Sequence, residues 1–213
     1  GLVFGPPPTQ NYSALLNWSN FSVVLTSHSV IQPNFNRVVP NHYSATRSAL
    51  AELTKRGYRR IGLVVPPCVE EHENSFYRAA FTLRAAEQST WPPICYHDPE
   101  IHPPSHLRTW YDAHHPDALI LCYPLDDEIL LCPAIGPEIV AKLGVFLLGH
   151  DVHGRSSLAI NYRPHTLGEI SVDQLINQLH RGERGIPAFQ QTLSVEGELI
   201  VTAAPTPSLL TVA

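Results

Sequence analysis

The chain has 213 residues, 44% of them hydrophobic and 15% charged, so it can bury a substantial core, and the composition excludes a disordered chain despite twenty prolines. Its formal net charge is −5, and its longest basic clusters are the pairs Lys55-Arg56 and Arg59-Arg60. Because a nucleic-acid-binding surface is normally basic, we do not expect this chain to hold DNA by itself.

Short apolar runs alternate with segments of helical periodicity in the first half of the chain. Strands are predicted at residues 2–4, 21–26, 38–39, 59–65 and 94–96, and helices at residues 43–56, 70–88 and 105–114. Within the first helix, Ala45, Ala49 and Leu53 repeat at helical spacing, and Gly57 follows as a typical C-terminal residue. Ser105 is the expected N-terminal cap of the third helix.

The second half of the chain continues this alternation. Strands are predicted at residues 118–122, 145–148, 189–195 and 199–202, and helices at residues 125–143 and 166–179. Pro133 and Pro137 interrupt the first of these helices, and acidic residues 126–128 at its start suit the helix dipole. The second helix is amphipathic. This order of elements predicts an α/β fold with doubly wound parallel sheets.

The four cysteines, Cys68, Cys95, Cys122 and Cys132, are far apart and form no C-x-x-C pair. Three of them lie in or beside apolar runs, so we predict buried free thiols in a reducing cytoplasm. No apolar run approaches the roughly 18 residues of a membrane helix, and the N-terminus shows no charged region followed by an apolar one. We therefore expect neither a membrane segment nor a signal peptide.

Motifs that carry chemistry are missing from the sequence. It contains no G-x-G-x-x-G, no G-x-x-x-x-G-K-[ST], no G-x-S-x-G and no H-E-x-x-H. Five of the twelve histidines crowd one region, but their spacing matches no zinc ligand set; they are His97, His102, His106, His114 and His115. We therefore predict a protein that is not an enzyme and that has no cofactor and no metal site.

Asp151 is the first candidate for a ligand-binding residue. It follows the predicted strand over 145–148 and the pair Gly149-His150. In open α/β sheets ligands bind at the carboxyl ends of the strands, and a carboxylate there accepts hydrogen bonds from ligand hydroxyls. The alternative is a role in a loop or in capping a helix.

Four segments carry a family resemblance. Residues 41–61 contain L-T-K-R-G-Y-R-R-I, residues 116–122 read P-D-A-L-I-L-C, residues 148–151 read L-G-H-D, and residues 168–187 run from a glycine through a helical pattern to G-E-R-G-I-P. In this order they resemble the LacI/GalR family of bacterial transcription regulators, whose effector-binding domains show "L-x-x-x-G-H-R-x-I", "P-D-A-I-x-x", "G-x-D" and "G-x-x-A-x-x-x-L-x-x-x-x-x-G" there.

The resemblance implies a periplasmic-binding-protein-like fold, in which two doubly wound parallel-sheet lobes are joined by crossover strands and hold an effector between them. The first lobe would comprise residues 1–37 and 163–193, and would be incomplete. The second would comprise residues 38–162 and 194–213. The DNA-binding headpiece of the family would be absent from this chain.

The resemblance also suggests ligand-binding residues. Asp151 matches the family's Asp of that lobe edge, with His150 beside it, and the family's helix-borne Arg falls near Arg78. Tyr123 replaces a polar pair after the strand over 118–122. Two further candidates are Tyr162, on the second crossover, and Asn41. The alternatives stay open: Arg78 as a solvated helix residue, the tyrosines as packing residues, and Asn41 as a helix cap.

These expectations describe the effector-sensing and dimerisation domain of a cytoplasmic LacI-type regulator. Its partners would be a small molecule such as a neutral sugar, a second copy in a homodimer, and operator DNA through the headpiece. The alternative is a periplasmic sugar-binding protein that serves a transporter, which shares the fold. That class usually carries a secretory signal, so the expected lack of one counts against it.

Overall fold

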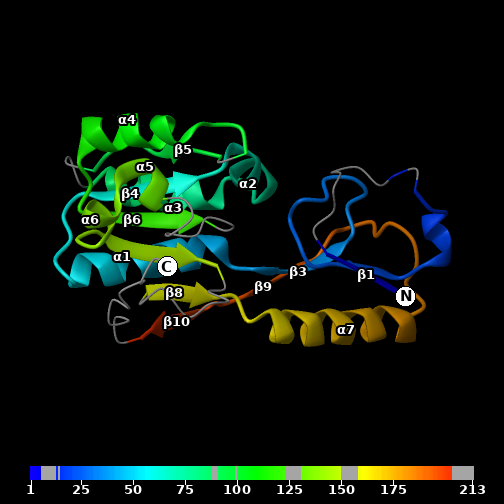
Figure 1. The fold of residues 1–213 in the computed structure, drawn as a ribbon. Coiled ribbons are helices and arrows are strands. Elements are labelled where there is room, and N and C mark those ends of the chain that lie inside the picture. Colours follow the sequence, from blue (N-terminus) through cyan, green and yellow to red (C-terminus); the bar gives the residue numbers. More distant parts are fainter. Residues whose placement is uncertain are drawn as a thin grey trace, which may run out of the picture.

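The computed structural model describes residues 1–5, 13, 15–87, 91–98, 100–122, 131–149 and 158–202. Its strands form two separate sheets, which lie in two lobes side by side (Figure 1). The predicted site residues Tyr123, His150 and Asp151 lie outside the described residues, as do Asp126 to Glu128. In the described part of the chain, no helix is long and apolar enough to span a bilayer.

The first sheet is entirely parallel. Its strand order is β1-β2-β3-β9, with β1 (Leu2–Phe4), β2 (Val23–Leu25), β3 (Asn36–Pro40) and β9 (Thr192–Val195). Helix α7 (Pro164–His180) packs on one face, where Leu167 meets Val24 and Val38. A short helix, η1 (Trp18–Asn20), belongs to the opposite core, where Trp18 packs against Phe35 with ring centroids 4.9 Å apart.

The second sheet has the order β10-β8-β7-β6-β4-β5 and is parallel except for β10. Its strands are β4 (Ile61–Val65), β5 (Cys95–Tyr96), β6 (Ala118–Cys122), β7 (Gly144–Leu148), β8 (Leu158–Asn161) and β10 (Glu198–Val201). The helices of this lobe are α1 (His42–Lys55), α2 (Pro67–His72), α3 (Phe76–Ala85), α4 (Pro104–His114), α5 (Cys132–Ile135) and α6 (Pro137–Val140).

Alternate residues of the second sheet feed two different cores. Ile61 and Ile120 face the core formed with α1 and α3, whereas Leu119 and Leu121 face the core formed with α4 and α5. β4 and β6 are buried along their whole length, as expected of parallel strands covered on both faces. The predicted doubly wound α/β fold is confirmed.

The chain passes three times between the two sheets. β3 leads into α1, β8 leads into α7, and β9 leads into β10 (Figure 1). β3 pairs with its first-sheet neighbours as far as Pro40, and β9 pairs as far as Val195. The three passages therefore follow residues 40, 161 and 195.

Two predicted details of the elements were wrong, and one strand was missed. The single helix expected over 70–88 is two helices, because Asn74 and Ser75 both adopt left-handed backbone angles, with φ of 53° and 59°. Ser105 does not cap α4, which begins at Pro104 and has Pro103 as its N-cap. β8 was not predicted as a strand at all, although it is central enough to pair with both β7 and β10.

The cysteines with described side chains are free thiols in two environments. Cys95 and Cys122 are buried in the second lobe, as predicted, whereas Cys68 is exposed near the start of α2. Burial raises the pKa of the Cys95 thiol to about 12, so this thiol stays protonated and unreactive at neutral pH.

Candidate functional site

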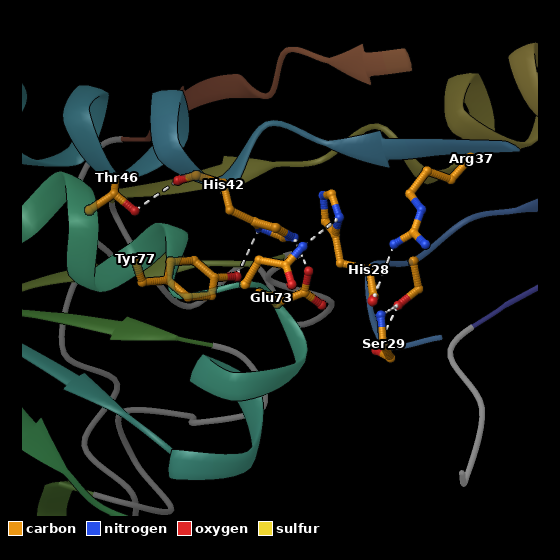
Figure 2. A network of polar contacts seen from close by, with 9 residues as sticks. His28, Ser29, Arg37, His42, Thr46, Glu73 and Tyr77 are labelled. Atoms are coloured by element: carbon orange, nitrogen blue, oxygen red, sulfur yellow. Dashed lines mark hydrogen bonds and ion pairs between the residues drawn. The ribbon is translucent and has the colours of Figure 1, made fainter. Parts of the chain in front are cut away.

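Buried polar side chains gather where β3 leads into α1, at the junction of the two lobes (Figure 2). His28 and Arg37 come from the first lobe, on the segment after β2 and on β3. His42, Glu73 and Tyr77 come from the second lobe, on α1, on the turn between α2 and α3, and on α3. We call these five residues the junction cluster.

The centre of the junction cluster is a chain of three side chains. The Tyr77 hydroxyl lies 2.9 Å from Nδ1 of His42, and Nε2 of His42 lies 3.0 Å from Oε2 of Glu73. Both ring nitrogens of His42 are therefore in polar contact, Nδ1 with the tyrosine hydroxyl and Nε2 with the carboxylate. The Thr46 hydroxyl donates to the His42 carbonyl, which holds the first turn of α1 in place.

His28 connects this chain to the first lobe. Its Nδ1 lies 3.3 Å from the side-chain amide nitrogen of Asn74, a contact between the segment after β2 and the turn before α3. The Arg37 guanidinium donates to the carbonyl oxygens of His28, at 3.3 Å, and Val30, at 3.1 Å. Arg37 therefore fixes the backbone that presents the His28 ring to the second lobe.

Charges in the junction cluster depend on Glu73. Burial by itself would raise the pKa of Glu73, but the contact with His42 at 3.0 Å and the nearness of His28 and His72 together lower it. Glu73 is therefore ionised at neutral pH. Burial also lowers the pKa of His28 from 6.5 to about 4, although the charge of Glu73 opposes this, so His28 is neutral.

Tyr162 extends the junction cluster toward the end of β8. Its ring meets the His42 ring edge to face, with centroids 4.9 Å apart. Burial raises the pKa of the Tyr162 hydroxyl, and the nearby Tyr77 side chain opposes part of this rise. The pKa of Tyr77 is also raised well above 10, first by burial and then by the negative charges that Tyr162 and Glu73 would place nearby.

A hydroxyl that contacts an imidazole, which in turn contacts a carboxylate, is also the arrangement that activates catalytic nucleophiles. Here the hydroxyl belongs to Tyr77, which is only 2% exposed and has a raised pKa. A nucleophile needs the opposite, an accessible group whose deprotonation is favoured. The arrangement therefore orients hydrogen-bonding groups, and it suits recognition of hydroxyl groups better than covalent chemistry.

The described site residues predicted from the sequence surround the junction cluster. Asn41 caps α1 by accepting from the Ser44 backbone N–H at 3.0 Å, and its amide donates to Oε1 of Glu196 at 2.7 Å. Both polar ends of Asn41 are therefore engaged within the protein. Tyr162 lies against His42, as described above.

Arg78 and Tyr77 are neighbours on α3 that differ in environment. The Arg78 side chain is 55% exposed, donates to the Ser75 hydroxyl and lies 3.6 Å from the buried carboxylate of Glu70. Tyr77 is the residue that α3 directs into the junction cluster. Burial raises the pKa of Glu70, and Arg78 partly opposes that rise.

Sequence reasoning missed His28, His42, Glu73 and Tyr77 as candidates for the site. His42 and Tyr77 both lie in segments that drew attention for other reasons, as neighbours of Asn41 and Arg78. The turn at Glu73 was hidden inside a predicted helix, although Asn74 and Ser75, which favour caps and turns over helix interiors, could have marked the break. His28 gave no signal, because its partners are distant in the sequence.

Comparison with known proteins gave structural matches only. No protein-family model matches the chain, and no curated protein sequence is similar to it. A protein described as a ribose operon repressor from Burkholderia thailandensis is 16% identical, with a TM-score of 0.66, over 95% of this chain and 77% of that one.

Two further similar structures hold sugars. A periplasmic binding protein/LacI transcriptional regulator from Alkaliphilus metalliredigens, complexed with D-xylulofuranose, is 16% identical with a TM-score of 0.62, over 93% of this chain and 74% of that one. A LacI family transcriptional regulator from Enterococcus faecium, with bound ribose, is 12% identical with a TM-score of 0.59. The match covers 86% of this chain and 71% of that one. At these identities the likeness shows the fold, which is that of LacI-type and periplasmic-binding-protein-like domains.

Proposed function

We propose that this chain is the effector-sensing domain of a LacI-type transcription regulator in the cytoplasm, and that it binds a small neutral sugar between its two lobes. The observation that carries the proposal is the junction cluster, a set of largely buried hydrogen-bonding groups contributed by both lobes. The fold supports it, because proteins of the same fold hold ribose and D-xylulofuranose.

The position of the candidates along the strands supports the same site. Glu73 follows β4 by way of α2, and Tyr162 directly follows β8. Tyr123 and Asp151 follow β6 and β7 in the sequence, with His150 before Asp151. All four strands are parallel, so their carboxyl ends share one sheet edge, which is where ligands bind in open α/β folds.

A role for each residue follows from its chemistry. Asp151 would accept hydrogen bonds from sugar hydroxyls, and Arg78 would donate hydrogen bonds to sugar oxygens. Tyr162 and Tyr123 would present ring faces or hydroxyls to the sugar. His42 would support the site indirectly, since both of its ring nitrogens are already in contact with Glu73 and Tyr77. The guanidinium of Arg37 is engaged with backbone carbonyls, which favours a neutral sugar over a sugar phosphate.

Sensing would work by a shift between two lobe arrangements. A ligand that contacts both lobes stabilises the arrangement it binds better, by the difference between its two affinities. The contact between His28 and Asn74 joins the lobes at this point and would change with their angle. In the full regulator, lobe rotation would alter the separation of two headpieces, on which operator affinity depends.

A thermal-shift screen tests the binding. Ribose, xylulose and cellobiose, with ribose 5-phosphate for comparison, are added to the purified chain. A sugar present at 100 times its Kd stabilises the folded state by about 2.7 kcal/mol. The shift should disappear in Asp151→Ala, weaken in Tyr162→Phe, and stay unchanged in Tyr43→Phe. Cooperative melting without a shift for any sugar would contradict the proposal.

The periplasmic sugar-binding protein remains the second candidate, because one similar structure is described as a periplasmic binding protein/LacI transcriptional regulator. Both candidates predict sugar binding, so a DNA-binding measurement separates them. The protein encoded by the complete gene should bind a specific operator fragment, and the sugar found above should change that affinity. An exported protein without DNA binding would favour the transporter component.

We further propose that the regulator is a homodimer, as a dimeric Lac repressor of the same fold is (18% identity, TM-score 0.57). Helix α7 leaves three apolar side chains 42–48% exposed, and they are Val172, Ile176 and Leu179. Such a ridge marks a contact surface. Analytical ultracentrifugation should give a dimer for the complete protein and a monomer for its Ile176→Glu variant. A dimer that persists in this variant would place the interface elsewhere.

A further inference from the structure

Three histidines come together at the edge of the second lobe, apart from the junction cluster. His97 directly follows β5, His102 lies on the turn that leads to α4, and His106 lies in the first turn of α4. One ring nitrogen of each lies within 4.8 Å of those of the other two. The sequence spacing had suggested no metal site, because the turn between His97 and α4 brings together residues that fit no known spacing.

The separation of the ring nitrogens suits a metal ion. Nδ1 of His97 lies 3.2 Å from Nδ1 of His106. Two nitrogens on one tetrahedral zinc ion, each about 2.0–2.1 Å from it, are roughly 3.3 Å apart. The His102 ring stacks on the His106 ring with centroids 4.6 Å apart, and a ligand nitrogen of His102 lies within 4.8 Å of those of His97 and His106.

The backbone holds the three histidines close together before any ion binds. The His97 N–H donates to the Val65 carbonyl at 3.1 Å, which ties it to the end of β4. The Asp98 carbonyl accepts from the N–H groups of Ile101 and His102, at 3.1 and 2.7 Å, and so closes the turn. Asp98 also donates its own N–H to Nδ1 of His102 at 3.1 Å. A preformed turn reduces the ordering cost of binding an ion.

The protonation of His97 and the exposure of the other two rings also favour binding of a metal ion. His97 is only 1% exposed, and burial together with the neighbouring rings of His106 and His102 lowers its pKa. The lowered pKa favours the neutral form of the His97 ring, and neutral imidazole is the form that ligates metals. His106 is exposed and His102 is half-buried, so an ion can reach the cluster from solvent.

We propose that His97, His102 and His106 form a binding site for a divalent transition metal ion that favours imidazole, such as Zn²⁺ or Ni²⁺. Three protein ligands leave at least one coordination position for water or for a group of another molecule. When the ion binds, the hydrogen bond between the two Nδ1 atoms is replaced by two metal–nitrogen bonds, and the proton of the donating ring moves to its Nε2.

The test titrates Zn²⁺ into the untagged protein in competition with a chromophoric chelator. One ion should bind per chain, with affinity at least about tenfold lower in His106→Gln and in His102→Gln. The matched control is His165→Gln, because the His165 side chain is 89% exposed on α7 in the other lobe, and it should leave the affinity unchanged. Co²⁺ should give a visible absorption band that disappears in His106→Gln.

Two outcomes would overturn the proposal: several weakly bound ions per chain, or a single site whose affinity is the same in His102→Gln, His106→Gln and the wild type. The buried His97 is left unchanged because its substitution could unfold the turn, and circular dichroism checks the fold of the other variants. Sugar is absent throughout, so this test fails or succeeds independently of the sensing function.

Discussion

At the scale of single residues, His28 makes stability depend on pH. Its pKa is about 4 in the folded chain, because burial disfavours the charged ring, and 6.5 is its ordinary value. Between these values the unfolded chain binds a proton that the folded chain does not, so the free energy of unfolding decreases as pH falls from 6.5 toward 4. The charge of Glu73 opposes this shift, and the charges of Arg37 and His42 add to it.

Urea denaturation at pH 7.5 and pH 5 measures this effect in the wild type and in His28→Gln. The wild type should lose about 1–2 kcal/mol more than the variant between these two pH values, since the ring remains partly solvated. Glu73 does not interfere, because its lowered pKa places its own loss of stability below pH 4.5. Equal losses in the two proteins would mean that His28 is not buried in its neutral form.

Asn41 illustrates how a single residue can be a candidate for two roles. Its side chain caps α1 and contacts Glu196, so Asn41→Ala should lower stability by about 1 kcal/mol. Asn41→Ser keeps a capping oxygen and should recover most of this loss in thermal unfolding. A normal melting temperature for Asn41→Ala, together with lost sugar binding, would instead favour the ligand role.

The residue scale is where sequence-based prediction was weakest. The carboxyl ends of strands could be found from apolar runs, which led to Asp151, whereas Tyr123 came from the family resemblance. The direction of a side chain on a helix could not, so attention went to Arg78 although its neighbour Tyr77 is the residue that reaches His42. Contacts such as His28 with Asn74 join residues 46 positions apart, and no local pattern reports them.

At the scale of elements, periodicity predicted most helices and strands because their apolar positions are buried as the pattern requires. Ala45, Ala49 and Leu53 of α1 are buried, and Gly57 follows with φ of 94°, a conformation that favours glycine. The failures occurred where a local conformation overrides the pattern. Asn74 and Ser75 adopt left-handed angles and separate α2 from α3, and the turn so formed presents Glu73 to His42.

The close packing of α4 on the second sheet is testable at Gly62. A Cβ atom at this position of β4 would lie 2.6 Å from the ring of Trp110 and 3.0 Å from the Leu119 side chain. Gly62→Ala should therefore destabilise the protein by about 1–3 kcal/mol, as overpacking does. Thermal unfolding gives the loss, and near-ultraviolet circular dichroism should show the displacement of the indole.

Gly168 provides the matched control for this substitution. It is exposed within α7, and a Cβ atom there would meet nothing within 4 Å. Gly168→Ala should raise stability by about 0.5–1 kcal/mol, because alanine loses less backbone entropy in a helix. If both variants behaved alike, the tight contact between Gly62 and Trp110 would not be present in solution.

At the scale of the whole molecule, the lobes are linked by contacts that a double-mutant cycle can measure. His28→Ala, Asn74→Ala and the double variant should show a coupling energy of about 0.5–1 kcal/mol, since the two side chains share a hydrogen bond across the junction. Urea denaturation supplies the four free energies. Strict additivity would indicate that the lobes are separated at this point in solution.

The fold of the whole molecule was predicted better than any of its parts. The alternation of apolar runs with helical segments fixes the doubly wound architecture, since each buried strand needs cover on both faces. The resemblance of four segments supplied the two-lobed arrangement, which composition alone could not indicate. The junction cluster escaped prediction because it depends on how the lobes meet, where distant residues such as His28 and Asn74 come into contact.

The three passages of the chain between the sheets bear on how the protein is made. β1, β2 and β3 leave the ribosome early, yet β9 can pair with β3 only after the whole second lobe has been synthesised. The edge of β3 stays open during that time, a condition that favours slow folding and exposes the nascent chain to aggregation. The last pieces to arrive, β9 and β10, complete one sheet each, so early termination of translation before residue 192 would leave both lobes unfinished together.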